Sequence, residues 1–375
     1  MATLFLYSNT NTFSFFFVTL VSLALLILRQ PTAAASCTTP PVIFNFGDSN
    51  SDTGGLVAGL GYTVGFPNGR LFFRRSTGRL SDGRLLIDFL CQSLNTSLLR
   101  PYLDSLGGTR FQNGANFAIV GSSTLPKNVP FSLNIQLMQF SHFKLRSLEL
   151  ASSPNSLKGM FISNDGFKNA LYMIDIGQND IAHSFAKGNS YSQTVKLIPQ
   201  IISEIKSGIK RLYDEGGRRF WIHNTGPLGC LPQKLSMVKS KDLDQHGCLA
   251  SYNSAANFFN QGLDHMCEEL RTKLRDATII YIDIYTIKYS LIANSNQYGF
   301  KRPLMACCGY GGSPYNYNVN ITCGHKGSNV CEEGSRYISW DGIHYIETAN
   351  AIIAMKVLSM HYSKPPTPFD FFCRR

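Results

Sequence analysis

Charged residues are scarce in this chain, and their scarcity limits the kind of protein it can be. Asp, Glu, Lys and Arg together account for 16% of the 375 residues, whereas apolar residues account for 44%. This composition is unlike that of a disordered or coiled-coil chain, so we expect a globular protein with a large core. Internal repeats and low-complexity linkers are also lacking. The length allows one domain or two, and we predict a single domain over residues 36–375.

Basic residues are absent before the main apolar run, which spans Phe13 to Leu28. The run is followed by Pro31-Thr-Ala-Ala-Ala-Ser36, whose small residues suit cleavage by signal peptidase. At about 16 residues, the run is long for the core of a signal peptide and short for a membrane span. We predict a signal peptide over residues 1–35, secretion, and no stable membrane span after cleavage. An uncleaved anchor is the less favoured alternative.

Ten cysteines are compatible with secretion, because an oxidising compartment allows disulfides to form. Their pairing does not follow from the sequence. A zinc cluster is an alternative for one group of residues, but this group lacks two Cys-x-x-Cys knuckles, so we expect no metal. The group consists of Cys307, Cys308, Cys323, His325 and Cys331.

The surface of the protein can be inferred in part from sequons and charge. Sequons at Asn95 and Asn320 predict glycosylation of exposed segments, if they are used. A net charge of +11 predicts attraction to an acidic partner, which for a secreted protein would be an anionic polysaccharide or a membrane surface rather than nucleic acid. The densest basic stretch is interpreted as a solvated loop without a dedicated ligand. It contains Arg70, Arg74, Arg75, Arg79 and Arg84.

Short apolar runs alternate with longer helical patterns from Pro41 onward. This order predicts a three-layer α/β/α sandwich, in which helices cover both faces of a mostly parallel central sheet. Helices are expected where apolar residues recur from Val195 to Leu212, from about Ser251 to Leu274, and from Glu347 to Met360. The expected strands are Val42–Phe46, Phe117–Val120, Leu171–Ile176, Arg219–His223 and Thr278–Ile284.

Ser49 is a candidate nucleophile in the stretch Phe46-Gly-Asp-Ser-Asn-Ser-Asp-Thr-Gly-Gly55. It follows the carboxyl end of the first expected strand, which is where open α/β sheets place their sites. A serine attacks only when a base takes its proton and hydrogen-bond donors hold the oxyanion that forms. Gly-Asp-Ser is also a common turn sequence, and on this stretch alone the two interpretations are equally favoured.

The segment Asp341-Gly-Ile-His344 supplies a candidate base. A carboxylate three residues before an imidazole is close enough to fix the tautomer of the ring. Such a pair by itself is more often a helix cap or a surface interaction. Its position just before the last expected helix makes it a candidate.

Donors for an oxyanion are expected after two other strands. In Ile176-Gly-Gln-Asn-Asp180, the side-chain amide of Asn179 would emerge at the same sheet edge as Ser49. In Asn113-Gly-Ala-Asn-Phe-Ala-Ile-Val-Gly-Ser122, Gly121 would let a backbone N–H approach without a side chain in the way. Each motif alone is also compatible with an ordinary turn.

Taken together, these four segments resemble the GDSL esterase/lipase family, also called SGNH hydrolases after the Ser, Gly, Asn and His of its four blocks. All four blocks are present in order, and the resemblance spans roughly Pro41 to Met360. It looks closest to the plant branch. The stretches that carry this likeness are Trp221-Ile-His-Asn-Thr-Gly-Pro-Leu-Gly-Cys-Leu-Pro232, Ala306-Cys-Cys-Gly-Tyr-Gly-Gly312 and Tyr337-Ile-Ser-Trp-Asp-Gly-Ile-His-Tyr345.

Two departures refine this resemblance. Asn50 stands where the family name has Leu, as is familiar in the plant branch, and this leaves Ser49 as the nucleophile. The chain also lacks a Gly-x-Ser-x-Gly elbow, which argues against the α/β-hydrolase fold. The resemblance instead implies the flavodoxin-like sandwich of SGNH hydrolases.

The resemblance implies a carboxylic ester hydrolase that works through an acyl-enzyme, without metal or organic cofactor. Ser49 would attack, His344 would act as the base oriented by Asp341, and Asn179 with the N–H groups of Gly121 and Ser49 would hold the oxyanion. The expected substrates are short acyl esters of a carbohydrate or glycosylated metabolite, and the expected location is the apoplast or cell wall, with association to acidic wall polysaccharide.

Three other functions remain open at this point. One is a lipase that acts on acyl lipids, because the family includes such enzymes. A second is glycoside hydrolysis, which needs two carboxylates beside the sugar bond, and no spacing singles out such a pair. A third is a carbohydrate-binding wall protein without turnover.

Overall fold

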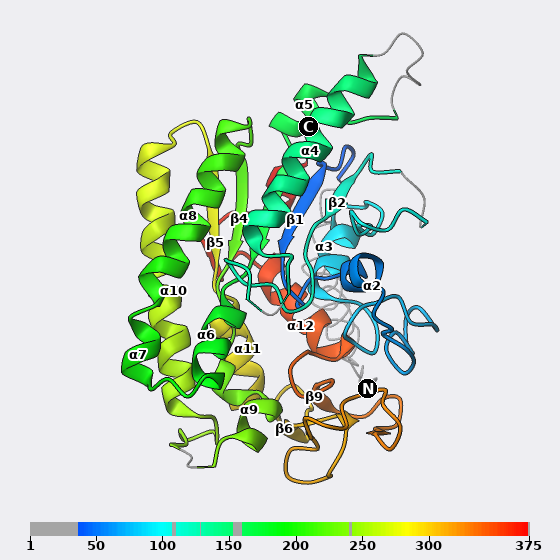
Figure 1. Ribbon diagram of the computed structural model, residues 1–375, viewed down its shortest axis with the longest axis vertical. Helices are drawn as coiled ribbons and strands as arrows, with labels where there is room; N and C mark the ends of the chain where they lie inside the picture. Colours follow the sequence, from blue (N-terminus) through cyan, green and yellow to red (C-terminus); the bar gives the residue numbers. More distant parts are fainter. Residues whose placement is uncertain (1–36, 107–109, 128, 153–159, 240–241, 374–375) are drawn as a thin grey trace, which may run out of the picture. The chain divides into compact units, whose positions relative to one another are not determined.

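Parallel strands form the centre of the structure (Figure 1). The computed structural model describes residues 37–373 except 107–109, 128, 153–159 and 240–241, and the elements below lie in the unit Thr38–Arg375. The main sheet has the strand order β10-β5-β4-β3-β1-β2, and only β10 runs antiparallel to its neighbour. Its strands are β1 (Ile43–Gly47), β2 (Gly114–Asn116), β3 (Leu171–Asp175), β4 (Arg219–His223), β5 (Thr278–Ile282) and β10 (Ser363–Lys364).

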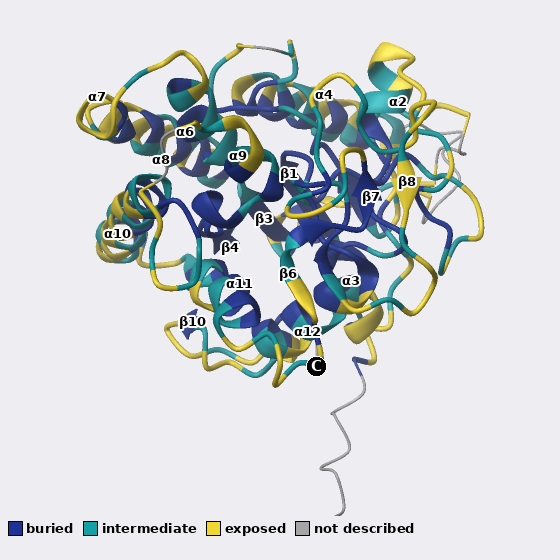
Figure 2. Ribbon diagram, turned by 90° about the horizontal axis from the view of Figure 1, so that it is seen from below, coloured by how far each residue is buried: buried dark blue, intermediate teal, exposed yellow. Residues whose placement is uncertain are grey.

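Helices cover both faces of this sheet (Figure 2). Side chains of α4, α8 and α10 join those of the strands in one large hydrophobic cluster. Helices α3, α11 and α12 pack against one another on the opposite face. The predicted three-layer sandwich with a mostly parallel sheet is therefore confirmed. The six helices are α3 (Leu86–Ser93), α4 (Leu133–Ala151), α8 (Ile198–Asp214), α10 (Ala250–Lys273), α11 (Ile284–Ala293) and α12 (Glu347–Leu358).

The remaining described elements are short and lie in the connections. Two small sheets pair β6 (Arg302–Ala306) with β9 (Tyr337–Ser339) and β7 (Cys308–Gly309) with β8 (Asn329–Val330). The short helices are α2 (Gly55–Leu60), α5 (Asn164–Lys168), α6 (Gln178–Ala186), α7 (Tyr191–Val195) and α9 (Pro232–Met237), with 3₁₀ turns at η1 (Leu228–Cys230) and η2 (Phe369–Phe372).

Most expected elements are present with bounds shifted by a few residues, and two departures have identifiable causes. The helix expected over residues 195–212 is divided, because Val195 ends α7 and α8 begins at Ile198. Pro199 occupies the first turn of α8, where its missing N–H costs nothing. Phe117–Val120 was expected to be a strand, but β2 precedes it. Its N–H groups still bond to β1, Phe117 to Asn45 and Ile119 to Gly47.

The carboxyl-terminal tail contains a strand that its composition does not predict. Ser363 and Lys364 form β10 directly before Pro365. β10 pairs with Ile282 and Tyr281 at the edge of the sheet. Two residues are too few to give a period-2 pattern, so only the pairing identifies the strand.

Disulfides occupy the cysteines that the zinc alternative would need. Cys307 pairs with Cys331 and Cys308 with Cys323, while a third bridge joins Cys230 to Cys248. Disulfide sulfurs are not available as thiolate ligands, so these four residues form no zinc site. Among the described residues there is also no other group of His, Cys, Asp and Glu that could hold a metal ion.

The basic stretch from Arg70 to Arg84 is solvated only in part, because Arg74 and Arg75 are exposed. The expectation of a solvated loop was wrong for Arg70 and Arg79, which are buried. Arg79 forms an ion pair with Asp88 on α3 at 2.7 Å, and Arg70 donates to the carbonyl oxygen of Cys331 at 2.5 Å. The partner of Arg70 is 261 residues away, so the sequence does not place the two side by side, whereas Asp88 lies nine residues after Arg79 on α3.

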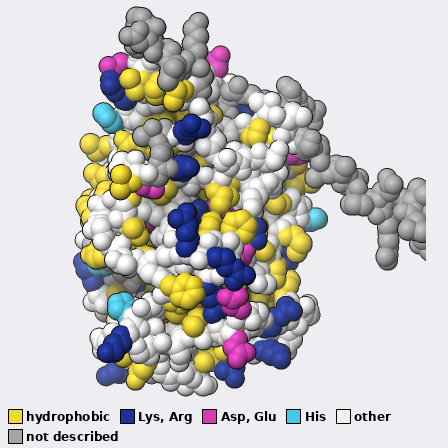
Figure 3. Space-filling model, turned by 90° about the vertical axis from the view of Figure 1, so that its right-hand side faces the viewer, with side chains coloured by type: hydrophobic (Ala, Val, Ile, Leu, Met, Phe, Trp, Pro, Cys, Tyr) yellow, Lys and Arg dark blue, Asp and Glu magenta, His cyan; other side chains and the backbone are white. Residues whose placement is uncertain are grey.

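The outer surface is mixed rather than strongly charged on the face that Figure 3 shows. Lys and Arg side chains there stand in separate groups among hydrophobic and uncharged ones. Asn95 and Asn320, the sequon residues, are both exposed. In the described part of the chain, no helix has the length and apolar character needed to cross a membrane. The signal peptide predicted over residues 1–35 lies outside the described residues.

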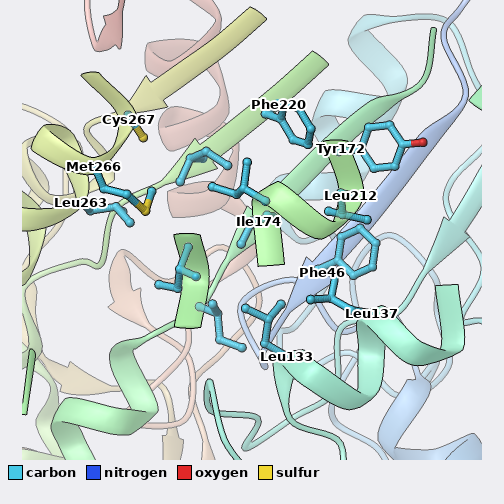
Figure 4. Packing of buried hydrophobic residues seen from close by; sticks show 14 of the residues in the cluster. Phe46, Leu133, Leu137, Tyr172, Ile174, Leu212, Phe220, Leu263, Met266 and Cys267 are labelled. Carbon is cyan, nitrogen blue, oxygen red and sulfur yellow. The ribbon is translucent and has the colours of Figure 1, made fainter. Parts of the chain in front are cut away.

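Aromatic rings dominate the core between β1 and α4 (Figure 4 shows part of the same cluster). Phe140 is fully buried, and its ring lies 4.9 Å from that of Phe44 and 5.6 Å from that of Tyr172. Edge-to-face contacts of this kind add to the stabilisation that comes from burying the rings. Phe140 therefore ties α4 to the centre of the sheet.

We expect Phe140→Ala to lower the free energy of unfolding by about 3–5 kcal/mol, because it leaves a cavity among rings that cannot collapse. Chemical denaturation followed by fluorescence measures this change. Phe258→Ala is the matched control, since Phe258 is 44% exposed, and it should change the free energy by less than about 1 kcal/mol. Equal losses in the two variants would contradict this account of the core.

Candidate active site

All five residues predicted to form the site line one cavity. The cavity has a volume of about 400 Å³ and lies beyond the carboxyl ends of β1 and β3. Ser49, Gly121, Asn179, Asp341 and His344 all contribute to its wall. These residues come from four segments far apart in the sequence, so the fold has brought together what the motifs predicted separately.

Ser49 lies at the tip of a tight turn after β1. The carbonyl oxygen of Asp48 accepts hydrogen bonds from the N–H groups of Ser51 and Asp52, at 3.2 and 3.0 Å. Gly47 begins this turn, and a Cβ at this position would lie 2.4 Å from the carbonyl oxygen of Asp175 on β3. Only glycine therefore allows β1 and β3 to stay paired up to the point where the chain turns towards Ser49.

His344 and Asp341 form a close pair. Nδ1 of His344 lies 2.6 Å from Oδ2 of Asp341, while Oδ1 of Asp341 accepts from the backbone N–H groups of Ile343 and His344 at 2.9 and 2.8 Å. Burial alone would raise the pKa of Asp341, but the imidazole charge and these hydrogen bonds outweigh it, and the pKa is lowered. The carboxylate is thus held ionised beside the ring.

The other ring nitrogen of His344 is available for a proton. Nε2 is buried and has no hydrogen-bond partner among the described residues. The tautomer that donates from Nδ1 to Asp341 leaves Nε2 with its lone pair, and His344 and Ser49 line the same cavity. A buried acceptor without a partner is costly unless it has a catalytic use or is met by solvent or ligand.

The turn that carries this pair is held by the disulfide-bonded segment. Gly342 has φ of +96°, and a Cβ there would lie 2.5 Å from the ring of Tyr317. The Trp340 N–H donates to the carbonyl oxygen of His344 at 2.7 Å, and the Trp340 carbonyl oxygen accepts from Cys308 at 2.6 Å. Because Cys308 is itself bridged to Cys323, the imidazole is fixed to a cross-linked frame.

Gly121 offers a free backbone donor to the cavity. It has φ of +79°, which glycine adopts without strain. Within the described part of the chain, neither its N–H nor that of Ser49 has a hydrogen-bond partner. The preceding residue, Val120, donates to Oδ2 of Asp52 at 2.8 Å, which ties this segment to the turn of Ser49.

Asn179 links the same two segments from the start of α6. Its amide nitrogen donates to the carbonyl oxygen of Ser122 at 2.9 Å and to Oδ2 of Asp48 at 3.4 Å. The next residue, Asp180, accepts from the N–H and hydroxyl of Thr124 at 3.0 and 2.9 Å. Asp180 therefore fixes the loop after Gly121 to the helix that carries Asn179, a role that the motif itself did not reveal.

A buried charged cluster lies beneath the turn of Ser49, and the sequence did not predict it. Lys288 of α11 is 6% exposed, and its ammonium lies 3.3 Å from Oδ1 of Asn50. The amide nitrogen of Asn50 donates in turn to Oδ1 of Asp48 at 3.0 Å. Asp175 belongs to the same electrostatic cluster, since its charge acts on both Asp48 and Lys288. Asn50 thus bridges the carboxyl group and the ammonium.

The cluster shifts two pKa values in opposite directions. Burial and the neighbouring charge of Asp175 raise the pKa of Asp48 to about 8. Burial lowers the pKa of Lys288, although the charges of Asp175 and Asp48 oppose this shift. Asp48 is therefore uncharged below neutral pH, and no negative charge then stands 3.4 Å from the amide of Asn179.

Comparison with known proteins identifies the family. Residues 43–357 match the family model described as GDSL-like lipase/acylhydrolase. The chain belongs to this family. An Arabidopsis thaliana GDSL esterase/lipase, LIP-4, is 91% identical over 375 residues, and the match covers all of both chains. A second GDSL esterase/lipase from the same plant is 74% identical over 374 residues, again over the full length of both chains.

This GDSL family member is therefore a carboxylic ester hydrolase, as its relatives' names state and as the sequence predicted. A more distant Arabidopsis relative, 43% identical over 357 residues and covering 90% of this chain and 95% of its own, is named alpha-L-fucosidase 3. Among solved structures, phospholipase A1 from Streptomyces albidoflavus aligns with a TM-score of 0.37 at 10% identity, covering 86% of this chain and 99% of its own.

The raised pKa of Asp48 makes the stability of this GDSL hydrolase pH-dependent. Between pH 3.8 and about 8 the native carboxyl keeps a proton that the unfolded chain releases, so this group's contribution to stability falls as pH rises. Asp48→Asn removes this titration. As pH increases from 5 to 8, we therefore expect the free energy of unfolding of Asp48→Asn to rise by at least about 2 kcal/mol relative to that of wild type. Urea denaturation at both pH values measures the difference.

The matched control for this measurement is Asp214→Asn, because Asp214 is exposed on α8. The change in its free energy of unfolding between pH 5 and pH 8 should equal that of wild type within about 0.5 kcal/mol. If the stability of Asp48→Asn showed the same pH dependence as that of wild type, the raised pKa of Asp48 would be refuted.

Proposed function

We propose that Ser49 is the nucleophile of this ester hydrolase, that His344 is its general base and acid, and that Asp341 orients His344. The observation that carries the proposal is the 2.6 Å contact between Nδ1 of His344 and Asp341, combined with an unpartnered Nε2 in the cavity that Ser49 lines. A base needs a fixed tautomer and a free nitrogen, and this pair has both.

The reaction proceeds in two halves. Nε2 of His344 takes the proton of Ser49 while Oγ bonds to the ester carbonyl carbon, and the charged ring is stabilised by the ionised Asp341. Collapse of the tetrahedral intermediate breaks the bond to the alcohol oxygen, which leaves with the proton from His344. Water then loses a proton to His344 as it attacks the acyl-enzyme. Collapse breaks the bond between the acyl carbon and Oγ, which takes that proton back from His344, and the free acid leaves.

The oxyanion would be held by Asn179 and by the backbone N–H groups of Gly121 and Ser49. Two of these donors have no partner in the described structure, and Asn179 is fixed by its bond to Ser122. Preorganised donors stabilise developing charge without having to reorganise, which is the usual source of the largest rate gain. An uncharged Asp48 below neutral pH supports this assignment, because a carboxylate there would oppose the oxyanion.

We propose short acyl groups on a carbohydrate or a glycosylated metabolite as the substrate class. The polar residues of the cavity wall support a hydroxyl-rich alcohol part, since amide groups suit recognition of hydroxyls. These residues include Asn68, Gln178, Gln233 and Thr322. A volume of about 400 Å³ is at the small end for binding pockets and favours a short acyl group. Lipase activity on long acyl chains is the second candidate.

Glycoside hydrolysis is not favoured by the carboxylates of the site. Of the acidic residues in the described part of the chain, only Asp341 lines the cavity, and its oxygens are engaged with His344 and backbone N–H groups. Asp48, Asp52 and Asp180 are buried and hydrogen-bonded inside the protein. A pair of carboxylates on either side of a sugar bond is therefore lacking here.

We further propose that the enzyme acts in the apoplast or cell wall. The disulfides support an oxidising compartment, and the exposed Asn95 and Asn320 are accessible for glycosylation. The net charge of +11 supports association with acidic wall polysaccharide.

We expect Ser49→Ala to lower turnover of p-nitrophenyl acetate by at least about 10⁴-fold while the protein stays folded, because the acyl-enzyme can no longer form. Labelling by a fluorophosphonate probe should be lost as well. Ser236→Ala, which changes an exposed serine of α9, serves as the control and should retain both. Full turnover by folded Ser49→Ala protein would refute the proposed nucleophile.

Asn179→Ala should leave a measurable residual rate. Losing one oxyanion donor typically costs about 2.7–4 kcal/mol, so we expect kcat to fall by about 10²–10³-fold with little change in KM. Steady-state kinetics on p-nitrophenyl acetate gives both constants. An unchanged kcat would remove Asn179 from the oxyanion hole.

A substrate screen decides between the two candidate classes. Purified enzyme would be assayed against p-nitrophenyl acetate, p-nitrophenyl palmitate and an acetylated polysaccharide, with Ser49→Ala as the blank. Release of acetate from the polysaccharide with no activity on palmitate would support the proposal. Preference for palmitate would favour the lipase alternative.

A further inference from the structure

Lys234 is a cation without a counterion in the active-site cavity. It lies on α9, shortly after Cys230 of the Cys230–Cys248 bridge, and it lines the cavity together with Ser49 and His344. Among the described residues, no carboxylate or other hydrogen-bond acceptor pairs with its ammonium group. Lys288, which is buried, differs in this respect, since it faces Asp48, Asp175 and Asn50.

Burial affects the protonation of this side chain. Removal from water lowers the pKa of Lys234 to about 8, with no neighbouring charge to oppose the shift. The ammonium is thus still protonated at neutral and acidic pH, although it has lost part of its solvation and no group in the described residues replaces it. A charge in this state is stabilised strongly by an anion that enters beside it, because the local dielectric constant is low.

The rest of the cavity wall cannot supply that anion. Asp341 is the only acid that lines it within the described residues, and its two oxygens are taken by His344 and two backbone N–H groups. The other titratable groups of the wall are His183 on α6, His344 and the hydroxyl of Tyr317. The Tyr317 hydroxyl accepts a hydrogen bond from Gln233, the neighbour of Lys234.

We propose that Lys234 binds a carboxylate carried by the substrate, so that the enzyme prefers esters with an acidic group next to the scissile bond. This inference rests on the proposed function, because it places the acidic group in the same cavity as Ser49. It specifies the substrate class further, because either the alcohol part or the acyl part of the ester would carry a free carboxylate. Lys234 selects the substrate by charge and takes no part in the bond-breaking steps.

Two pairs of matched esters test the inference. The alcohol-side pair is 4-acetoxybenzoate and 4-acetoxybenzamide, and the acyl-side pair is mono-4-nitrophenyl glutarate and the corresponding glutaramate. Within each pair, one ester carries a carboxylate and the other carries a neutral amide at the same position. The readout is the ratio of kcat/KM for the acid to that for the amide, because effects on the shared catalytic groups cancel in the ratio.

We expect wild type to prefer the acid in at least one pair, and that pair tells which part of the substrate carries the acidic group. Lys234→Gln should lower this ratio at least tenfold, mainly through KM, whereas Lys234→Arg should keep most of it. Lys239→Gln is the matched control, since Lys239 is exposed and does not line the cavity. It should leave the ratio at the wild-type value.

The pH dependence of the ratio gives a second readout. The preference should be lost as pH rises through about 8, where Lys234 loses its proton. Burial and the charges of Lys187 and Lys127 lower the pKa of His183, so a preference due to His183 would already be lost below pH 7. Loss in that lower range would assign the preference to His183 and overturn the inference.

Failure of this inference is separable from failure of the proposed function. If wild type prefers the amide in both pairs, or if Lys234→Gln keeps the wild-type ratio, the role of Lys234 is refuted while loss of activity in Ser49→Ala still supports the nucleophile. If Ser49→Ala hydrolyses the esters at the wild-type rate, the proposed function fails first.

Discussion

The pairing of β1 with β3 is the constraint on which the rest of the site depends. Gly47 lies opposite Asp175 in the parallel register, and any side chain at Gly47 would collide with the backbone of β3. Because the two strands stay together to their carboxyl ends, the turn of Ser49 and the start of α6 with Asn179 emerge side by side. The same strand pairing brings Asp48 and Asp175 close together, so the charged cluster with Lys288 is a consequence of the geometry that builds the site.

Sequence patterns predicted the layers of the fold because those patterns are local. Each parallel strand buried on both faces is a continuous apolar run, and a helix such as α8 repeats its apolar residues at 3.6-residue intervals. Features set by contacts between separate segments were missed. Arg70 and Arg79 were taken as solvated, although Asp88 and the disulfide-bonded segment bury them, and β10 is a strand only through its pairing with β5.

Prediction of the site had the same limits. The five motif residues converge on one cavity, as expected from strand ends that share a sheet edge. The supporting residues were not predicted, because Lys288 and Lys234 stand in helices with no motif of their own. Asn50 was noticed only as a departure from the family name. In the structure its amide joins Asp48 to Lys288, which leucine could not do, so the departure and the buried lysine belong to one arrangement.

Two buried carboxyl groups of the site differ in charge for a simple physical reason. Burial acts on both in the same direction, since it raises the pKa of Asp341 as it does that of Asp48. Asp341 receives an imidazole and two backbone N–H groups that favour its ionised form, whereas Asp48 faces the like charge of Asp175. In the proposed mechanism, negative charge is thus kept beside the base, where it stabilises imidazolium, and removed from the oxyanion side, where it would repel the intermediate.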